Sequence, residues 1–389
     1  MEIRKHLAFT RQEYLGRIDR VRARMKERGL DALLLHTPEN ICYLSGFQTS
    51  GYYFVQVLIV PADTGPVFVV RELEKRNAEA WSWLADDQVI GYMDYDNPAE
   101  MVFATISDLG LADGRLGFEM DGYSFLPIAR YEELKSRLAG ATLVNGSGMV
   151  EKERAIKSPA ELDYIRQACR ITELGMGAVR DNLRPGMSEN ELAGHVHKTV
   201  VAAGGEYPGL PLFLSSGWRT SIPHANPTDK VIETGDHVFT ELTGVVRRYA
   251  GPLFRTFSVG EPTRLVARNA AITEDILEAV IAAVRPGVTS QDVNAVVGPV
   301  TRRWGIPGSV TKRAGYSVGL NFPPDWGEGV FLDIKKDDPT VLEPGMVFHV
   351  PQKLALPGEP VYAISETLLI TEHGHEALTR FEPRKLVVV

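Results

Sequence analysis

An internal repeat constrains the fold of this chain more than any other feature of its sequence. The tripeptide ITE at 171–173 recurs at 272–274, and RPG at 184–186 recurs at 285–287. Both offsets are 101 residues (272 − 171 and 285 − 184), and the segments that follow each RPG match in type. Two matches at one offset favour a duplication. We therefore expect a pseudo-symmetric α+β region of two halves, each with two helices followed by antiparallel strands, and a cleft between the halves.

A smaller region precedes the repeat. Thr10 and Glu13 form a capping pair that opens a helix, and Gly29 ends it. Farther on, Ser158 is followed by Pro159 and Glu161, the pattern of a helix N-terminus. Between these helices, apolar runs predict strands and patterned segments predict helices, which are the strands 31–36, 54–60 and 66–70 and the helices 98–109 and 127–138. The alternation predicts an α/β domain over 1–155, followed by a second domain over 156–389.

Composition excludes several classes of partner. The chain has 389 residues, enough for two domains with their own cores. Its formal net charge of −8 argues against nucleic acid or an anionic membrane as the main partner. No stretch approaches the roughly 20 apolar residues of a membrane span, and the first residues lack an apolar signal core. Two cysteines make no disulfide framework. We expect a cytoplasmic protein.

Residues 239–260, FTELTGVVRRYAGPLFRTFSVG, resemble a stretch of the creatinase/aminopeptidase family. In that family two aspartates in this stretch hold metal ions. Here the first position is Glu241 and the second, at the same spacing (252 − 241 = 11), is Pro252. The resemblance covers essentially the whole chain and is strongest over 151–372. It implies a creatinase-type α/β N-terminal domain and a pseudo-symmetric α+β catalytic domain with the pitta-bread fold.

The other three metal-ligand positions of the family are also altered. The resemblance places the family's histidine at Tyr316 and its two glutamates at Pro351 and Glu366. Proline offers no side-chain donor, and a hard divalent cation needs more than two carboxylates and a phenol. We therefore expect no catalytic metal and no cofactor.

Without a metal ion to generate hydroxide, the reaction needs another nucleophile or base. The resemblance puts Glu241 at the end of a strand facing the cleft, Glu366 in the same pocket, and His224 where a family histidine assists proton transfer. Each also has a structural interpretation: a salt-bridged glutamate for the first two and a satisfied loop histidine for the third. The remaining histidines singled out are expected to be structural or on the surface, namely His195, His197, His373 and His375.

The segment GYSVGLNFPPDWGEG (315–329) departs most from the peptidases and resembles ectoine hydrolases, a metal-poor branch of the family. Ectoine is a zwitterionic cyclic amidine with a ring carboxylate. Trp326 could cover its amidinium by a cation–π contact, with Asp325 or Glu328 pairing the N–H groups. The alternative is that this segment is a purely structural turn. Tyr316 is expected beside the substrate.

The ring carboxylate needs a cation, for which we rank Arg71 above Arg219 and Arg313. Arg255 is expected to be structural. Tyr52 and its neighbour Tyr53 are wall or lid candidates, with core aromatics as the alternative.

The resemblance implies hydrolysis of ectoine, or 5-hydroxyectoine, to N-acetyl-2,4-diaminobutyrate. In the expected mechanism Glu241 adds to the amidine carbon and water activated by His224 releases the product; in a variant Glu241 is only a general base. Three rivals stay open: a creatinase-like amidinohydrolase, a proline-specific aminopeptidase and a non-catalytic peptide-binding module. A homodimer and a downstream deacetylase are the expected partners.

Overall fold

The computed structural model describes residues 5–122, 126–308, 313–328 and 331–389. The chain forms two compact units, Met1–Arg154 and Ala155–Val389. The second unit begins just before the long helix α7, Pro159–Asn182, whose N-terminus is fixed by a capping box. The hydroxyl of Ser158 accepts the N–H of Glu161 at 3.3 Å, and the Glu161 carboxylate accepts the N–H of Ser158 at 2.9 Å. This part of the sequence therefore specifies its own helix start.

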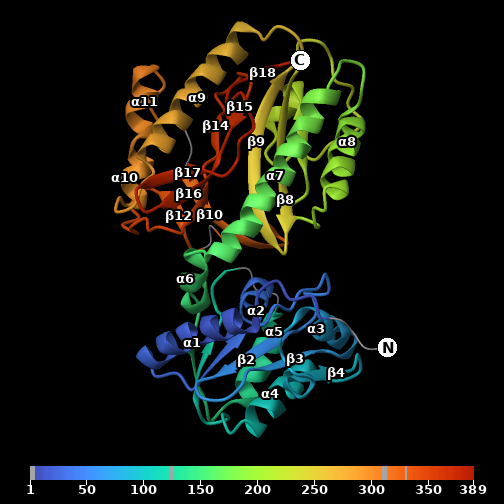
Figure 1. The fold of residues 1–389 in the computed structure, drawn as a ribbon, viewed down its shortest axis with the longest axis vertical. Coiled ribbons are helices and arrows are strands. Elements are labelled where there is room, and N and C mark those ends of the chain that lie inside the picture. Colours follow the sequence, from blue (N-terminus) through green and yellow to red (C-terminus); the bar gives the residue numbers. More distant parts are fainter. Residues whose placement is uncertain (1–4, 123–125, 309–312, 329–330) are drawn as a thin grey trace. The chain divides into compact units, whose positions relative to one another are not determined.

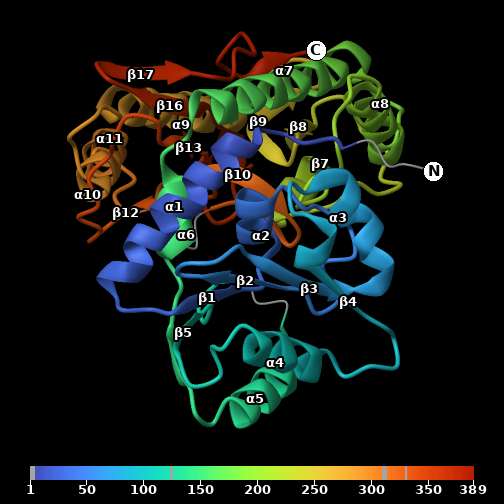
Figure 2. The same cartoon turned by 60° about the horizontal axis from the view of Figure 1, so that its bottom comes forward.

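The first unit is a mixed sheet with helices on both faces. Its strands lie in the order β4-β3-β2-β1-β5-β6, with β1–β2 and β2–β3 antiparallel and the other pairs parallel. Figure 2 shows α1, α2 and α3 on one side of this sheet and α4 and α5 on the other. The strands are β1 Ala32–Leu35, β2 Val57–Pro61, β3 Val67–Arg71, β4 Val89–Tyr92, β5 Arg115–Phe118 and β6 Thr142–Asn145. The helices are α1 Arg11–Glu27, α2 Pro38–Ser45, α3 Lys75–Trp81, α4 Pro98–Asp108, α5 Ile128–Arg137 and α6 Met149–Ala155.

The predicted elements of this unit are present. Thr10 caps α1 by accepting the N–H of Glu13 at 3.2 Å. The three predicted strands correspond to β1, β2 and β3, and the two predicted helices to α4 and α5. The α/β class of the first unit is therefore confirmed.

The second unit is built on a ten-stranded sheet whose main path runs β17-β16-β13-β10-β9-β8-β7. Figure 1 shows α7 and α8 along one part of this sheet and α9, α10 and α11 along the other. The helices after α7 are α8 Glu189–Ala202, α9 Arg264–Ala283, α10 Ser290–Ala295 and α11 Val297–Arg303. The strands are β7 Phe213–Ser216, β8 His237–Val246, β9 Tyr249–Ser258, β10 Arg313–Phe322, β11 Asp325–Gly327, β12 Asp333–Lys335, β13 Val347–His349, β14 Gln352–Leu354, β15 Tyr362–Ile364, β16 Thr367–Thr371, β17 Gly374–Ala377 and β18 Val387–Val388.

The sequence repeat is also a structural repeat. Gly186 donates its N–H to the carbonyl of Ile232 at 2.8 Å, and Gly287, 101 residues later, donates to Leu342 at 2.9 Å. Both glycines have positive φ, +89° and +83°, a backbone conformation that residues other than glycine rarely adopt. Each half also has its own apolar core, one between α7, α8 and β7–β9 and one between α9–α11 and the later strands. The predicted pseudo-symmetric α+β domain is confirmed.

Across the described residues, none of the helices is both long and apolar enough to span a bilayer.

Candidate active site

Glu241 lies in the interior of β8, and not at a strand end as the sequence suggested. It pairs directly with Phe213 of β7 and with Phe254 of β9, so the three side chains share one face of the sheet. Glu241 is only 6 % exposed, and its carboxylate accepts no hydrogen bond from the described residues. Burial raises the pKa of this carboxyl well above its usual range; Lys353 lowers it and Asp325 raises it further. Glu241 is thus a buried acid without a hydrogen-bonding partner in the part of the chain that the structure describes.

Lys353 on β14 is a cation that interacts electrostatically with Glu241. The sequence prediction missed this residue. Its ammonium lies 5.9 Å from the ring centroid of Phe239, which is two residues before Glu241 on the same face of β8. It forms neither an ion pair nor a hydrogen bond with any described residue, although burial lowers its pKa and Glu241 opposes that shift. One signal pointed to it: in an extended strand Lys353 shares a face with Pro351, one of the altered ligand positions.

An aromatic layer flanks Glu241. The ring centroids of Phe213 and Trp326 are 5.8 Å apart. The ring of Phe213 also contacts the imidazole of His224, with 5.1 Å between the centroids. Trp326 is 1 % exposed, whereas His224 is exposed and has a positive φ of 54°. Asp325 accepts the N–H of Trp326 at 2.7 Å, which holds the turn. The geometry brings the predicted His224, Trp326 and Asp325 to the surroundings of Glu241; Gly329, the last residue of the motif, lies outside the described residues.

Tyr316 joins a buried hydrogen-bonded chain behind this layer. Its hydroxyl accepts the indole N–H of Trp326 at 3.0 Å and lies 2.8 Å from Nδ1 of His349. Nε2 of His349 lies 2.7 Å from Oγ of Ser365. Burial, then the charge of Glu241, raises the pKa of Tyr316 well above its usual value, so the phenol keeps its proton. Burial, helped by two arginines, lowers the pKa of His349 well below its usual value, so the imidazole is neutral.

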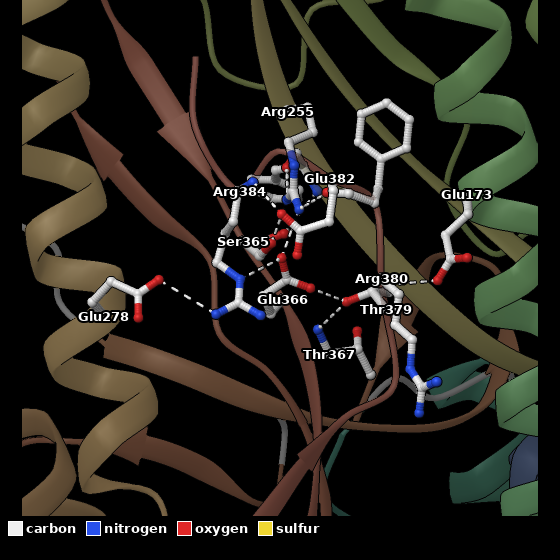
Figure 3. Close-up of polar contacts among 12 residues, drawn as sticks. Glu173, Arg255, Glu278, Ser365, Glu366, Thr367, Thr379, Arg380, Glu382 and Arg384 are labelled. Atoms are coloured by element: carbon white, nitrogen blue, oxygen red, sulfur yellow. Dashed lines mark hydrogen bonds and ion pairs between the residues drawn. The ribbon is translucent and has the colours of Figure 1, made fainter. Parts of the chain in front are cut away.

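Glu366 does not present a free carboxylate. Figure 3 shows Arg255, Arg384 and Thr379 all directed at it. Arg255 and Arg384 donate to Oε1 at 2.6 and 3.2 Å, and Thr379 donates to Oε2. Arg255 also donates to the carbonyl of Ser365 at 2.6 Å. The predicted catalytic role of Glu366 gains no support from this geometry, whereas both terminal nitrogens of Arg255 donate hydrogen bonds that hold the strands together.

Glu328 is similarly occupied. Its carboxylate accepts from Lys157 at 2.7 Å and from Ser317 at 3.0 Å, and both members of the ion pair are 1 % exposed. A buried pair of this kind is costly to break. Glu328 therefore has a partner already, and its predicted contact with substrate is also unsupported.

The three ranked arginines have acidic partners. Arg219 pairs with Glu189, and Arg313 pairs with Asp333 at 2.8 Å. In the first unit, Arg71 pairs with Asp94, donating to it at 2.6 Å, and lies 4.1 Å from the ring of Phe54. Of the two tyrosines in the same unit, Tyr52 is half-buried and Tyr53 is 67 % exposed.

Comparison with known proteins places the chain in a family. Residues 163–372 match metallopeptidase family M24, and residues 17–156 match the creatinase/prolidase N-terminal domain. The chain is 32% identical over 407 residues to an ectoine hydrolase of Halomonas elongata, covering 99% of this chain and 100% of that protein. It is 27% identical to the Xaa-Pro dipeptidase of Pyrococcus furiosus, covering 94% and 98%. The fold matches the Xaa-Pro dipeptidase from Bacillus anthracis with a TM-score of 0.83 at 24% identity, covering 97% and 100%.

The chain therefore belongs to metallopeptidase family M24 and carries a creatinase/prolidase N-terminal domain. It is a hydrolase of this family, whose relatives act on C–N bonds.

The side chains at the family's metal-ligand positions do not fit a metal centre. Pro252 and Pro351 have no donor, the hydroxyl of Tyr316 is used by Trp326 and His349, and Glu366 is neutralised by two arginines. In the described parts of the chain, no three His, Cys, Asp or Glu side chains gather closely enough to hold an ion. Divalent cations need such oxygen or nitrogen donors, so these positions do not offer a metal ion a suitable set of ligands.

Proposed function

We propose that this chain hydrolyses ectoine, a cyclic amidine that carries a carboxylate, to N-acetyl-L-2,4-diaminobutyrate without a metal ion. One observation carries the proposal: the buried acid Glu241 of β8 and the half-buried base Lys353 of β14 lie among aromatic rings, and neither has a hydrogen-bonded partner in the described parts of the chain. Buried charges are normally paired. A zwitterion with an amidinium for Glu241 and a carboxylate for Lys353 would supply both missing partners.

In the proposed reaction the Glu241 carboxylate bonds to the amidinium carbon. One ring C–N bond then breaks, its nitrogen takes a proton, and water releases the acetylated product and restores the carboxylate. Proximity must supply much of the acceleration because addition ends the amidinium resonance; well-oriented groups can contribute about 7–11 kcal/mol. Lys353 performs no chemistry but fixes the orientation of the ring through its carboxylate.

The full-length similarity to an ectoine hydrolase supports this substrate over the rival ones. A creatinase-like reaction on a linear guanidino acid would be expected to use a histidine where this chain has Tyr316. A peptidase of this family would need the metal ligands that are missing. The homodimer and the downstream deacetylase remain predictions.

The test is incubation of chelator-treated protein with ectoine, 5-hydroxyectoine, a guanidino acid and an Xaa-Pro dipeptide, followed by chromatography. We expect acetyl-diaminobutyrate from ectoine and no gain on adding manganese or cobalt. Turnover of the dipeptide only after metal addition would refute the proposal.

A further inference from the structure

The hydrogen-bonded chain behind the aromatic layer has two possible arrangements of its protons. Trp326 can only donate, so the oxygen of Tyr316 accepts there. The imidazole of His349 is neutral and carries one N–H, either on Nδ1 toward Tyr316 or on Nε2 toward Ser365. Oγ of Ser365 also accepts the backbone N–H of Phe254 at 2.7 Å.

Each of the two arrangements leaves one buried O–H without an acceptor among the described residues. With the proton on Nε2, Ser365 accepts from both His349 and Phe254, and its own O–H has no acceptor among the described residues although Ser365 is fully buried. With the proton on Nδ1, Ser365 donates to Nε2, His349 donates to Tyr316, and the O–H of Tyr316 is the one left over. Ser365 is 0 % exposed behind His349, whereas Tyr316 is 7 % exposed and bonded to Trp326 of the aromatic layer. Because buried donors are nearly always satisfied, a ligand that accepts the O–H of Tyr316 favours the second arrangement.

In that arrangement the oxygen of Tyr316 accepts two hydrogen bonds, from Trp326 and from His349, and its own O–H remains to be donated. Within the described residues no internal acceptor takes it up. Tyr316 is bonded to Trp326, whose ring lies 5.8 Å from that of Phe213, the direct cross-strand neighbour of Glu241. The O–H is therefore free for a ligand atom held at Glu241.

From this geometry, and resting on the proposed function, we infer that Tyr316 is the catalytic acid that protonates the leaving ring nitrogen, with His349 and Ser365 as positioning residues. The electron pair of the breaking C–N bond stays with the leaving nitrogen, which takes the Tyr316 proton. The other nitrogen closes a C=N bond to the carbon held by Glu241. The two N–H groups of Trp326 and His349 stabilise the resulting phenolate.

The phenolate then serves as the base for the second step. It takes a proton from water, hydroxide adds to the carbon, and Glu241 leaves as a carboxylate. The surplus proton goes to the released amine, so Tyr316 and Glu241 end as they began. One residue thus acts first as acid and then as base.

The first test is Tyr316→Phe, with Tyr362→Phe as the matched control. Tyr362 is also buried, at 1 % exposed against 7 % for Tyr316, and donates its hydroxyl to one acid, Glu274, at 2.9 Å. For Tyr316→Phe we expect kcat to fall about 10²- to 10⁴-fold while the Kd for ectoine changes less than about tenfold, the effect of one neutral hydrogen bond. Equal losses of kcat in the two variants, or a kcat near wild type for Tyr316→Phe, would overturn the assignment.

A second readout reports the tautomer directly and needs no turnover. Nitrogen NMR of histidine-labelled Glu241→Gln protein saturated with ectoine, with His349→Gln in the same background used to assign the signal, should show the proton on Nδ1. A proton on Nε2 would contradict the arrangement even if Tyr316→Phe were inactive. A wild-type protein that opens no cyclic amidine would refute the proposed function, whereas an active wild type with an unimpaired Tyr316→Phe variant would refute this inference alone.

Discussion

At the scale of single residues, the site is defined by groups left without partners. Glu241 is buried and Lys353 is half-buried, and each lacks a hydrogen bond among the described residues. Such groups destabilise a fold. They persist where binding or catalysis needs them. The neighbouring acids Glu328 and Glu366, by contrast, are fully paired and contribute to holding the structure together.

Replacing Glu241 should therefore stabilise the protein at high pH. Because the folded state raises the pKa of this carboxyl above its ordinary 4.5, the carboxyl is least unfavourable below pH 4.5 and becomes unfavourable as the pH rises through its folded pKa. We expect Glu241→Gln to be more stable than wild type at pH 8, by about 1–3 kcal/mol. Thermal melts across pH should show this difference shrinking toward pH 4.5; a difference that grows toward low pH would have the wrong sign.

Lys353 should discriminate between ligands with and without a carboxylate. Losing one charge-assisted hydrogen bond costs about 1.5–3 kcal/mol, so we expect Lys353→Met to lower kcat/KM for ectoine about 10- to 100-fold. A cyclic amidine without the carboxylate should bind wild type and variant alike. Lys336→Met, at a lysine paired on the surface with Asp337, is the control. Equal losses for both ligands would mean that Lys353 has a structural role.

At the scale of elements, close packing of α7 on the β8–β9 hairpin holds Glu241 in place. Gly244 and Gly251 face each other across the hairpin. Thr172 of α7 accepts the N–H of Gly244 at 2.6 Å and donates to the carbonyl of Gly251 at 2.7 Å. The helix backbone can approach this closely only because neither strand residue carries a side chain.

A methyl group at Gly251 should disrupt this packing. Its Cβ would lie 2.5 Å from the sulfur of Cys169 and 2.7 Å from the backbone nitrogen of the same residue. Overpacking of this kind costs about 1–3 kcal/mol or more, so we expect Gly251→Ala to unfold at lower denaturant. Gly194→Ala is the control, since a Cβ there meets nothing within 4 Å and an exposed helical glycine gains about 0.5–1 kcal/mol from this change. If Gly251→Ala left the stability unchanged, the close packing of α7 on the hairpin would not explain why glycine is present there.

Local patterns predicted elements well, and contacts between distant segments poorly. The caps at Thr10 and Ser158 depend on residues three positions away, so the sequence contains the whole interaction. The pairing of Glu366 depends on Arg255, 111 residues earlier, and on Arg384. Nothing in the local pattern distinguishes a paired from an unpaired glutamate, which is why Glu366 was expected to face substrate.

At the scale of the whole molecule, the duplication determines the two-half fold of the second unit. The altered ligand positions determine the chemistry that its site can perform. The repeat, visible at a 101-residue offset, predicted the two-half architecture because its turns use glycines at positive φ. The altered ligand positions Pro252, Tyr316 and Pro351 could also be found from the sequence. Lys353 could be found only through the strand face that it shares with Pro351. His349 could not be found, because its importance lies in what the other half of the domain places beside it.

The proposed reaction depends on a covalent bond between Glu241 and the substrate. The most direct measurement is acid quenching of the enzyme during turnover of ectoine, followed by peptide mass spectrometry. We predict a peptide containing Glu241 whose mass is raised by one bound substrate, absent from Glu241→Gln, which should be inactive. An unmodified Glu241 peptide in every quenched sample, together with full turnover by Glu241→Gln, would contradict the account.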